Sequence, residues 1–199
     1  MVLNMLRKQF VTLALVLSSF GALAAEESSS TVSYTLTRQY GSVFFRVMQQ
    51  SYLNLVGRFD DYSATLEMDF EDLTNSRLTA TVQMGSLDMA DGDVVETLVN
   101  SSAWFNAQLY PEAIFTTTQV EVTGDNSADF HGEMNFVGAT KPWTLHIEFF
   151  GGTDNMLTGS TIGMLAKGSF DRTDFGLDQY MNMANELVSI EVNAKFNRN

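Results

Sequence analysis

Apolar and polar residues alternate along most of this chain, which is typical of β-strands that bury one face. In the clearest run, from Tyr62 to Phe70, every second residue is apolar. Comparable runs recur at roughly the 8–12-residue spacing of a β-sandwich or barrel. They cover residues 31–38, 43–49, 78–84, 114–122, 130–136, 143–149, 162–170 and 188–196. The alternation therefore predicts an all-β protein.

One segment, residues 91–107, departs from this period. Its apolar residues, among them Val94 and Leu98, fall close to helical spacing. Acidic residues lie near its start, where a helix N-terminus favours negative charge. We predict one short helix here, with a break near Ser101.

The strand-like runs together predict a closed sheet. Nearly every run has one apolar face, and turns rich in Asn, Gly and Asp separate the runs. About eight antiparallel strands that close on themselves form a barrel that side chains fill or that holds one small ligand. We therefore predict a single antiparallel β-barrel of about eight strands, with the short helix inserted around residues 91–107.

The N-terminus has the features of a secretion signal. Arg7 and Lys8 precede an apolar stretch from Phe10 to Phe20, and Ala22-Leu23-Ala24 gives the small-x-small site of a signal peptidase. We predict a cleaved signal peptide over residues 1–24, a flexible lead-in over 25–30, a barrel domain over 31–199, and a periplasmic location. The apolar stretch is too short for a stable membrane anchor, so we expect no membrane insertion.

The chain is strongly acidic, with 24 Asp and Glu against 11 Lys and Arg and a formal net charge of −13. This charge argues against nucleic acid as a partner, because such binding needs cations that neutralise phosphates. It also argues against an anionic membrane surface. The chain contains no cysteine, so disulfides and thiol chemistry are excluded.

The sequence carries no catalytic or metal-binding signature. The two histidines, His131 and His146, alternate with apolar neighbours and are predicted to face solvent. A zinc site would need a ligand set that is not visible, and neither a nucleophile elbow nor a phosphate loop is present. We predict no catalytic residue, metal or cofactor, although a pair of carboxylates placed for acid–base chemistry remains open.

Large apolar residues are abundant instead, with 15 Phe and 11 Met in the chain. Methionine is flexible and suits adaptable apolar walls. A lumen lined by such residues could accept an apolar guest, because each buried methylene contributes about 0.8 kcal/mol.

Two turn-like motifs stand between the runs, VGATKPW (residues 137–143) and FDRTDFGL (residues 170–177). In the first, Lys141-Pro142 is predicted to form a turn at the entry to a strand. In the second, Arg172 and Asp174 are predicted to share one face of a strand as an ion pair, and Gly176 to permit a sharp bend. Both motifs are interpreted as structural.

The order of several motifs resembles that of the YceI-like family. These are VFFRVMQQSYLNLVGRF (43–59), SLD (86–88), NSSAWFNAQLYPEAIFTTT (100–118), VGATKPW and RTDFG (172–176), and they cover essentially the whole predicted mature chain. The resemblance implies an elongated, lipocalin-like barrel, usually exported, whose lumen holds polyisoprenoids or other long amphipathic molecules. It implies no catalytic residues, and it suggests a quinone-related role.

Two segments depart from the family's pattern. Gln49-Gln50-Ser51 stands where relatives commonly have His-x-Gly, and residues 86–98 read SLDMADGDVVETL where relatives often carry Arg and His. So acidic a segment would bind a pyrophosphate head poorly.

The leading prediction is a periplasmic carrier for a polyisoprenoid, quinone or similar lipid. The predicted lumen residues are Phe45, Val47, Leu66, Met68, Val82, Phe136, Leu145, Ile147, Phe149, Met164, Phe170 and Ile190. Those predicted near the barrel mouth are Tyr52, Trp104, Phe105 and Phe175. Two alternatives remain, a hydrolase or isomerase acting on an amphipathic substrate in the same cavity, and a stress-response interaction protein with a filled barrel. A homodimer is also left open.

Overall fold

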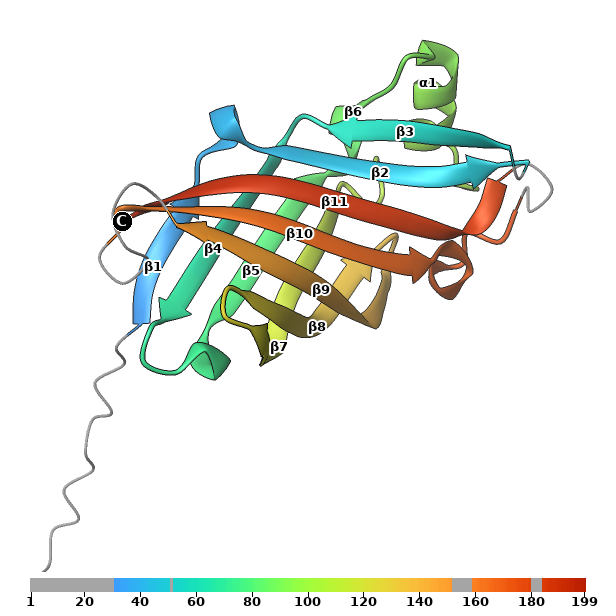
Figure 1. Ribbon diagram of the computed structural model, residues 1–199. Coiled ribbons are helices and arrows are strands. Elements are labelled where there is room, and N and C mark those ends of the chain that lie inside the picture. The colour runs from blue at the N-terminus through green and yellow to red at the C-terminus, as the bar shows by residue number, and fades with distance from the viewer. Residues whose placement is uncertain (1–30, 51, 152–158, 180–183) are drawn as a thin grey trace, which may run out of the picture.

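The computed structural model describes residues 31–50, 52–151, 159–179 and 184–199 (Figure 1). The predicted signal peptide and lead-in lie outside the described residues. No helix within the described part of the chain is long and apolar enough to cross a membrane.

Eleven strands and one α-helix make up the described regular structure, with four short 3-10 helices between them. The strands are β1 Thr31–Leu36, β2 Ser42–Gln49, β3 Leu53–Phe59, β4 Tyr62–Asp69, β5 Arg77–Gln83, β6 Leu87–Asp88, β7 Glu112–Gly124, β8 Ser127–Phe136, β9 Ala139–Gly151, β10 Thr161–Asp171 and β11 Ala184–Arg198. The helices are α1 Gly92–Asn100 and the 3-10 helices η1 Arg38–Tyr40, η2 Leu73–Asn75, η3 Met84–Ser86 and η4 Arg172–Phe175.

The strands form a closed antiparallel barrel, as predicted. Their order is β1-β4-β5-β7-β8-β9-β10-β11, and a β1–β11 pairing closes the ring of eight. From β11 the same sheet continues into β2, β3 and the two-residue β6. Figure 1 shows these three strands together with α1 along one side and end of the barrel.

The long strand β11 explains why the two ends of the barrel differ. Near its C-terminus it pairs with β1, as in Leu36 opposite Phe196. Further back it pairs with β2, as in Phe45 opposite Ile190. The 3-10 helix η1 separates β1 from β2, and the two strands pair with different parts of β11. One end of the barrel is therefore closed by β1 and β4, and the other is walled by β2 and β3.

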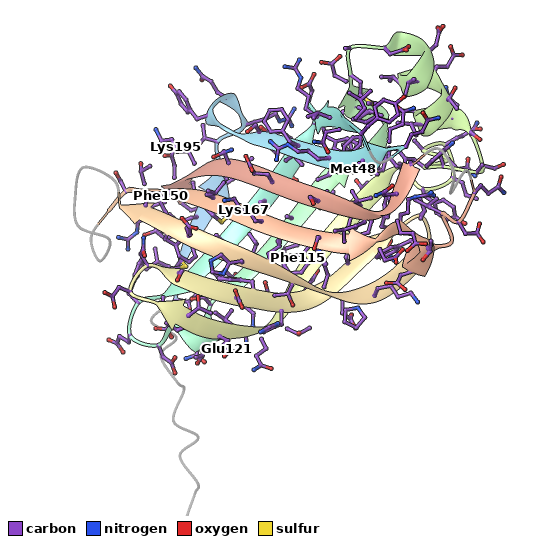
Figure 2. The ribbon with its side chains drawn as sticks, turned by 45° about the vertical axis from the view of Figure 1, so that its right-hand side comes forward. Met48, Phe115, Glu121, Phe150, Lys167 and Lys195 are labelled. Carbon is purple, nitrogen blue, oxygen red and sulfur yellow. The ribbon has the colours of Figure 1, made fainter. Side chains whose placement is uncertain are left out.

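Two hydrophobic clusters follow this division. The closed-end cluster is packed around side chains with almost no exposure, such as Tyr34, Leu66, Phe130, Ile147 and Phe196. The cavity-end cluster lies where β2 and β3 wall the barrel, and its members are Val43, Phe45, Phe59, Tyr62, Met84, Leu87, Phe105, Met134, Phe136, Phe175 and Leu177. Figure 2 marks Phe115, which is buried, whereas Met48 and Phe150 are exposed.

Helix α1 forms where the helical spacing predicts it and ends at Asn100, next to the predicted break. Asp91 caps its N-terminus, since the carboxylate accepts hydrogen bonds from the backbone N–H groups of Asp93 and Val94 at 3.1 and 3.3 Å. Its apolar side chains pack against the cavity-end cluster, yet none is fully buried. The helix therefore covers the barrel without being part of its core.

The prediction for Lys141-Pro142 is wrong. The turn of this motif lies at Val137 and Gly138, whose φ angles are 43° and 80°, and Pro142 is inside β9 opposite Glu133 of β8. The ladder between β9 and β10 reaches only from Gly151 to His146. Among the described strands Pro142 thus has a partner on one side only, and such a position tolerates the missing N–H of proline.

Candidate functional site

The cavity-end half of the barrel encloses a cavity of about 900 Å³. Its walls come from the inward faces of β2, β5, β7, β8, β9, β10 and β11, from β3, and from α1 with the loops on either side of it. Most of the lining is apolar, for example Val47, Val82, Ala113 and Val188. The closed-end cluster lies beyond it, so the cavity occupies only part of the barrel length.

A continuous chain of aromatic rings, which we call the aromatic belt, crosses the cavity wall. Adjacent ring centroids are between 5.6 Å (Phe115–Trp143) and 6.3 Å (Phe59–Phe105) apart. In spatial order the belt consists of Phe45, Phe59, Phe105, Phe136, Phe170, Trp143 and Phe115. Because such pairs contribute about 0.5–1.5 kcal/mol beyond the area they bury, the belt gives the wall a defined shape.

Glycines in the strands make room for these rings. Gly57 of β3 lies directly opposite Phe45 of β2, and a Cβ built at Gly57 would be 2.3 Å from the ring atom Cε1 of Phe45. At Gly132 of β8 a Cβ would be 2.7 Å from the ring of Phe115. The close approach of ring to backbone requires glycine at both positions.

The exposed residues of the lining identify where the cavity opens. They come from two segments alone, β3 and residues 90–97, which lead into α1 and form its first turns, while the rest of the described lining is buried or half-buried. We call this set the mouth, and it comprises Leu53, Asn54, Val56, Ala90, Asp91, Asp93 and Thr97. Strand β3 pairs with β6 only at Arg58 and Phe59. The cavity opens along the remaining, unpaired edge of β3, beside α1.

Arg172 is a buried residue of the cavity lining that binds the backbone of neighbouring segments. It lies on η4 and is only 3% exposed. The guanidinium donates hydrogen bonds to the backbone carbonyls of Asn185 (3.0 Å), Gln179 (3.0 Å), Ala184 (2.9 Å) and Leu177. The sequence-based prediction that this residue shares a strand face with Asp174 is wrong, since η4 replaces a strand here and Asp174 is exposed.

Electrostatics and capping fix the turn around Arg172. Burial lowers the pKa of the Arg172 guanidinium, and the nearby Asp171, Glu186 and Asp178 act in the opposite direction. Hydrogen bonds from the Thr173 hydroxyl and backbone N–H lower the pKa of Asp171, which caps η4. Gly176 ends η4 with a φ of 78°, the sharp bend predicted for it.

The sequence model of the YceI-like domain matches residues 29–196. The chain belongs to the YceI-like family. Protein YceI of Salmonella newport (strain SL254) is 28% identical over 186 residues, which cover 92% of this chain and 93% of that protein. Protein YceI of Salmonella arizonae is 27% identical over the same length.

Solved structures share the YceI-like fold. BcnA of Burkholderia cenocepacia superposes with a TM-score of 0.73 at 18% identity, covering 80% of this chain and 98% of that one. A polyisoprenoid binding domain from Saccharophagus degradans, implicated in plant cell wall breakdown, gives a TM-score of 0.64 at 12% identity, covering 84% and 99% of the two chains. At these identities the likeness establishes the fold, and the resemblance seen in the motifs is confirmed.

In this YceI-like barrel all the predicted lumen residues are at least half-buried, but they divide between the two clusters. Those that line the cavity are Phe45, Val47, Val82, Phe136, Leu145, Phe170 and Ile190. Those that instead pack in the closed-end cluster, away from the cavity, are Leu66, Met68, Ile147, Phe149 and Met164.

The residues predicted near the mouth have three different placements. Trp104 and Phe105 line the cavity. Phe175 is buried behind the lining, with its ring centroid 5.4 Å from that of Phe136. Tyr52 is 78% exposed in the turn between β2 and β3 and does not line the cavity. Their roles in binding stay predictions.

Several lining residues were not predicted. Val94 and Leu98 of α1 line the cavity, and their spacing of four was a usable signal, because such residues share one helix face. Leu53 and Leu55 belong to β3, which the alternation did not separate from its neighbours. Arg172 had no signal, since only the fold shows that its charge is turned toward backbone carbonyls.

The histidines lie outside the cavity, as predicted. His131 contacts the hydroxyl of Thr144 at 2.9 Å, and His146 contacts Asp129 at 2.6 Å. Both pairs lie on β8 and β9, on side chains that are partly exposed. Across the described residues, no three His, Asp or Glu side chains are grouped so as to hold a metal ion.

Proposed function

We propose that this protein is a periplasmic carrier that sequesters a long amphipathic molecule, such as a polyisoprenoid or a quinone-like lipid. The observation that carries the proposal is the cavity of about 900 Å³, walled by apolar and aromatic side chains and open at one mouth. Small-molecule sites typically measure roughly 300–1,000 Å³, so this cavity is at the large end of that range. The apolar tail would lie along the aromatic belt, with the polar head at the mouth.

Binding of this kind needs no reactive group. Ten methylenes buried from water would contribute about 8 kcal/mol, from which the costs of association and ordering must be subtracted. The remainder still permits useful affinity. The fold shared with a polyisoprenoid binding domain supports the same class of ligand.

The two alternatives fit the site less well. An enzyme would be expected to bury a carboxylate with a shifted pKa inside the chamber. The acidic residues that line this cavity, Asp91 and Asp93, are instead exposed at the mouth. In an interaction protein with a filled barrel, side chains would occupy the barrel along its whole length. The cavity argues against this alternative.

Native mass spectrometry of the full chain purified from its own host tests the proposal. We expect an apolar ligand that is released by organic extraction. Val47→Trp replaces a lining residue by a larger one that would fill part of the cavity, so it should reduce ligand occupancy. The matched control Val122→Trp places the same side chain at an exposed position on β7 and should leave occupancy unchanged. Purified protein without any apolar ligand, and without binding of added amphiphiles, would overturn the proposal.

The periplasmic location is tested separately by cell fractionation and N-terminal sequencing. We expect the protein in the periplasmic fraction with Ala25 as its first residue. An intact N-terminus in the cytoplasmic fraction would overturn this part.

A further inference from the structure

The charged groups of the cavity lining are few and unevenly placed. Among the described residues that line it, only Asp91, Asp93 and Arg172 carry charge. The two carboxylates are exposed at the mouth, whereas Arg172 is a buried residue of the lining. A polar head that rests at the mouth would therefore meet negative charge first.

The cation is already engaged by the protein itself. Four backbone carbonyls accept hydrogen bonds from the Arg172 guanidinium, and a fifth contact is the ring of Trp104, whose centroid is 5.4 Å from the guanidinium carbon. Asp171, Asp178 and Glu186 are close enough to interact with its charge. A carboxylate or phosphate head would have to displace these groups in order to pair with Arg172.

The start of α1 is similarly occupied. A helix N-terminus offers backbone N–H groups and a positive dipole end to anions. Here the Asp91 carboxylate takes the N–H groups of Asp93 and Val94, at the mouth itself. The anion that this helix end favours is thus a side chain of the protein.

We propose that the mouth selects amphiphiles with a cationic head, accepts uncharged heads less tightly, and discriminates against anionic heads. This inference rests on the proposed lipid-binding function. Two carboxylates at the mouth attract a cation and repel an anion, while both groups that could bind an anion are already satisfied. Because the carboxylates are exposed, salt should weaken the preference: the Debye length falls from about 8 Å at 0.15 M to about 3 Å at 1 M.

Three probes that share one tail separate the effect of head charge from that of the tail. They are hexadecyltrimethylammonium, hexadecanol and hexadecyl sulfate, whose head charges do not change on binding. Each competes with N-phenyl-1-naphthylamine, an apolar dye that fluoresces when buried; the two charged probes stay below their micelle concentrations and hexadecanol below its solubility limit. At low salt we expect the cationic probe to bind about 3–10-fold more tightly than the alcohol, and the sulfate to bind more weakly than the alcohol. The three affinities should converge at 1 M salt.

Substitution locates the effect. Asp91→Asn with Asp93→Asn removes both charges from the mouth, and Asn keeps the N-cap of α1. We expect the ratio of this variant's affinities for the cationic probe and the alcohol to fall most of the way to one. The matched control Glu121→Gln with Asp125→Asn removes two charges from the hairpin between β7 and β8 and should retain the preference; Glu121 is marked in Figure 2.

The outcomes distinguish the inference from the function on which it rests. Failure of all three probes and of the dye to bind would overturn the carrier function. Equal affinities for the three heads, or tightest binding of the sulfate, would overturn the charge preference and leave the carrier function intact. A preference that survives in the Asp91/Asp93 variant would show that these residues do not cause it.

Discussion

Replacement of Arg172 by methionine should destabilise the protein strongly, because this side chain ties together the chain on either side of residues 180–183. The guanidinium binds the carbonyls of Leu177, Gln179, Ala184 and Asn185. Gln179 and Asn185 are exposed, so their carbonyls can bind water in the variant, whereas Leu177 and Ala184 are buried. A buried acceptor left unpaired costs about 1–3 kcal/mol, so the two together predict a loss of about 2–6 kcal/mol.

Urea unfolding followed by tryptophan fluorescence measures this loss. Trp104, which lies against the guanidinium, serves as a local reporter. Arg172→Lys should fall between the wild type and the methionine variant, because an ammonium has three donors and lacks the planar fork of a guanidinium. The matched control is Arg46→Met, which removes an exposed arginine 3.3 Å from Glu191 and should cost no more than about 1 kcal/mol.

Two results would refute this reasoning. One is a loss below about 1 kcal/mol in the Arg172→Met variant with an unchanged denaturant slope, since water would then have replaced the guanidinium at every carbonyl. The other is an equal loss in the Arg46→Met control. Either result would mean that the buried arginine contributes no more than an exposed one.

Three further predictions concern the cavity wall and the dependence of stability on pH. Gly57→Ala should push the Phe45 ring toward the cavity, weaken dye binding and destabilise the fold by about 1–3 kcal/mol. In the control Gly85→Ala the added methyl group meets nothing within 4 Å, so dye titration and urea unfolding should both give wild-type values. Burial raises the pKa of Tyr34 above its usual 10.0, so the contribution of this residue to stability is complete below pH 10 and falls as pH rises through the folded-state pKa. The urea midpoint should therefore drop less steeply in alkaline solution for Tyr34→Phe; an identical slope would contradict this. Hydrogen bonds from Thr173 lower the pKa of Asp171, so its contribution is present above the usual 3.8 and is lost as pH falls through the folded-state pKa. Asp171→Asn should flatten the acid side of the same titration, and an unchanged acid slope would exclude that contribution.

Alternation predicted the strands well because it reflects a direct physical cause, the opposite orientation of successive side chains in a strand. The run at residues 62–70 corresponds to β4, and the run at 188–196 lies within β11, which extends from Ala184 to Arg198. Strand ends were missed where a ladder continues into exposed hairpins. Alternation alone did not resolve β3, because its edge lines the cavity and neighbouring residues such as Leu55 and Val56 are both apolar. The motif over residues 43–59, which resembles the family's opening strand pair, does cover β3 and all but the first residue of β2.

The extent of the cavity could not be predicted in the same way. Leu66 and Val82 both point inward, and nothing in their local sequence separates them. Leu66 packs in the closed-end cluster, whereas Val82 lines the cavity. The difference arises where β11 exchanges β1 for β2 as its partner, which is a property of the whole sheet. The acidic mouth was easier to anticipate, because Asp91 and Asp93 lie in a segment whose charge is evident from the sequence.

The division of the barrel also bears on what occupies the cavity. The cavity of about 900 Å³ opens to solvent at the mouth, so either water or a ligand can fill it. Water beside the aromatic belt would have few polar partners, whereas a long apolar tail would restore dispersion contacts along the wall and release that water. This difference is the physical reason to expect a resident amphiphile, with the closed-end cluster supplying the stability that keeps the cavity walls in place.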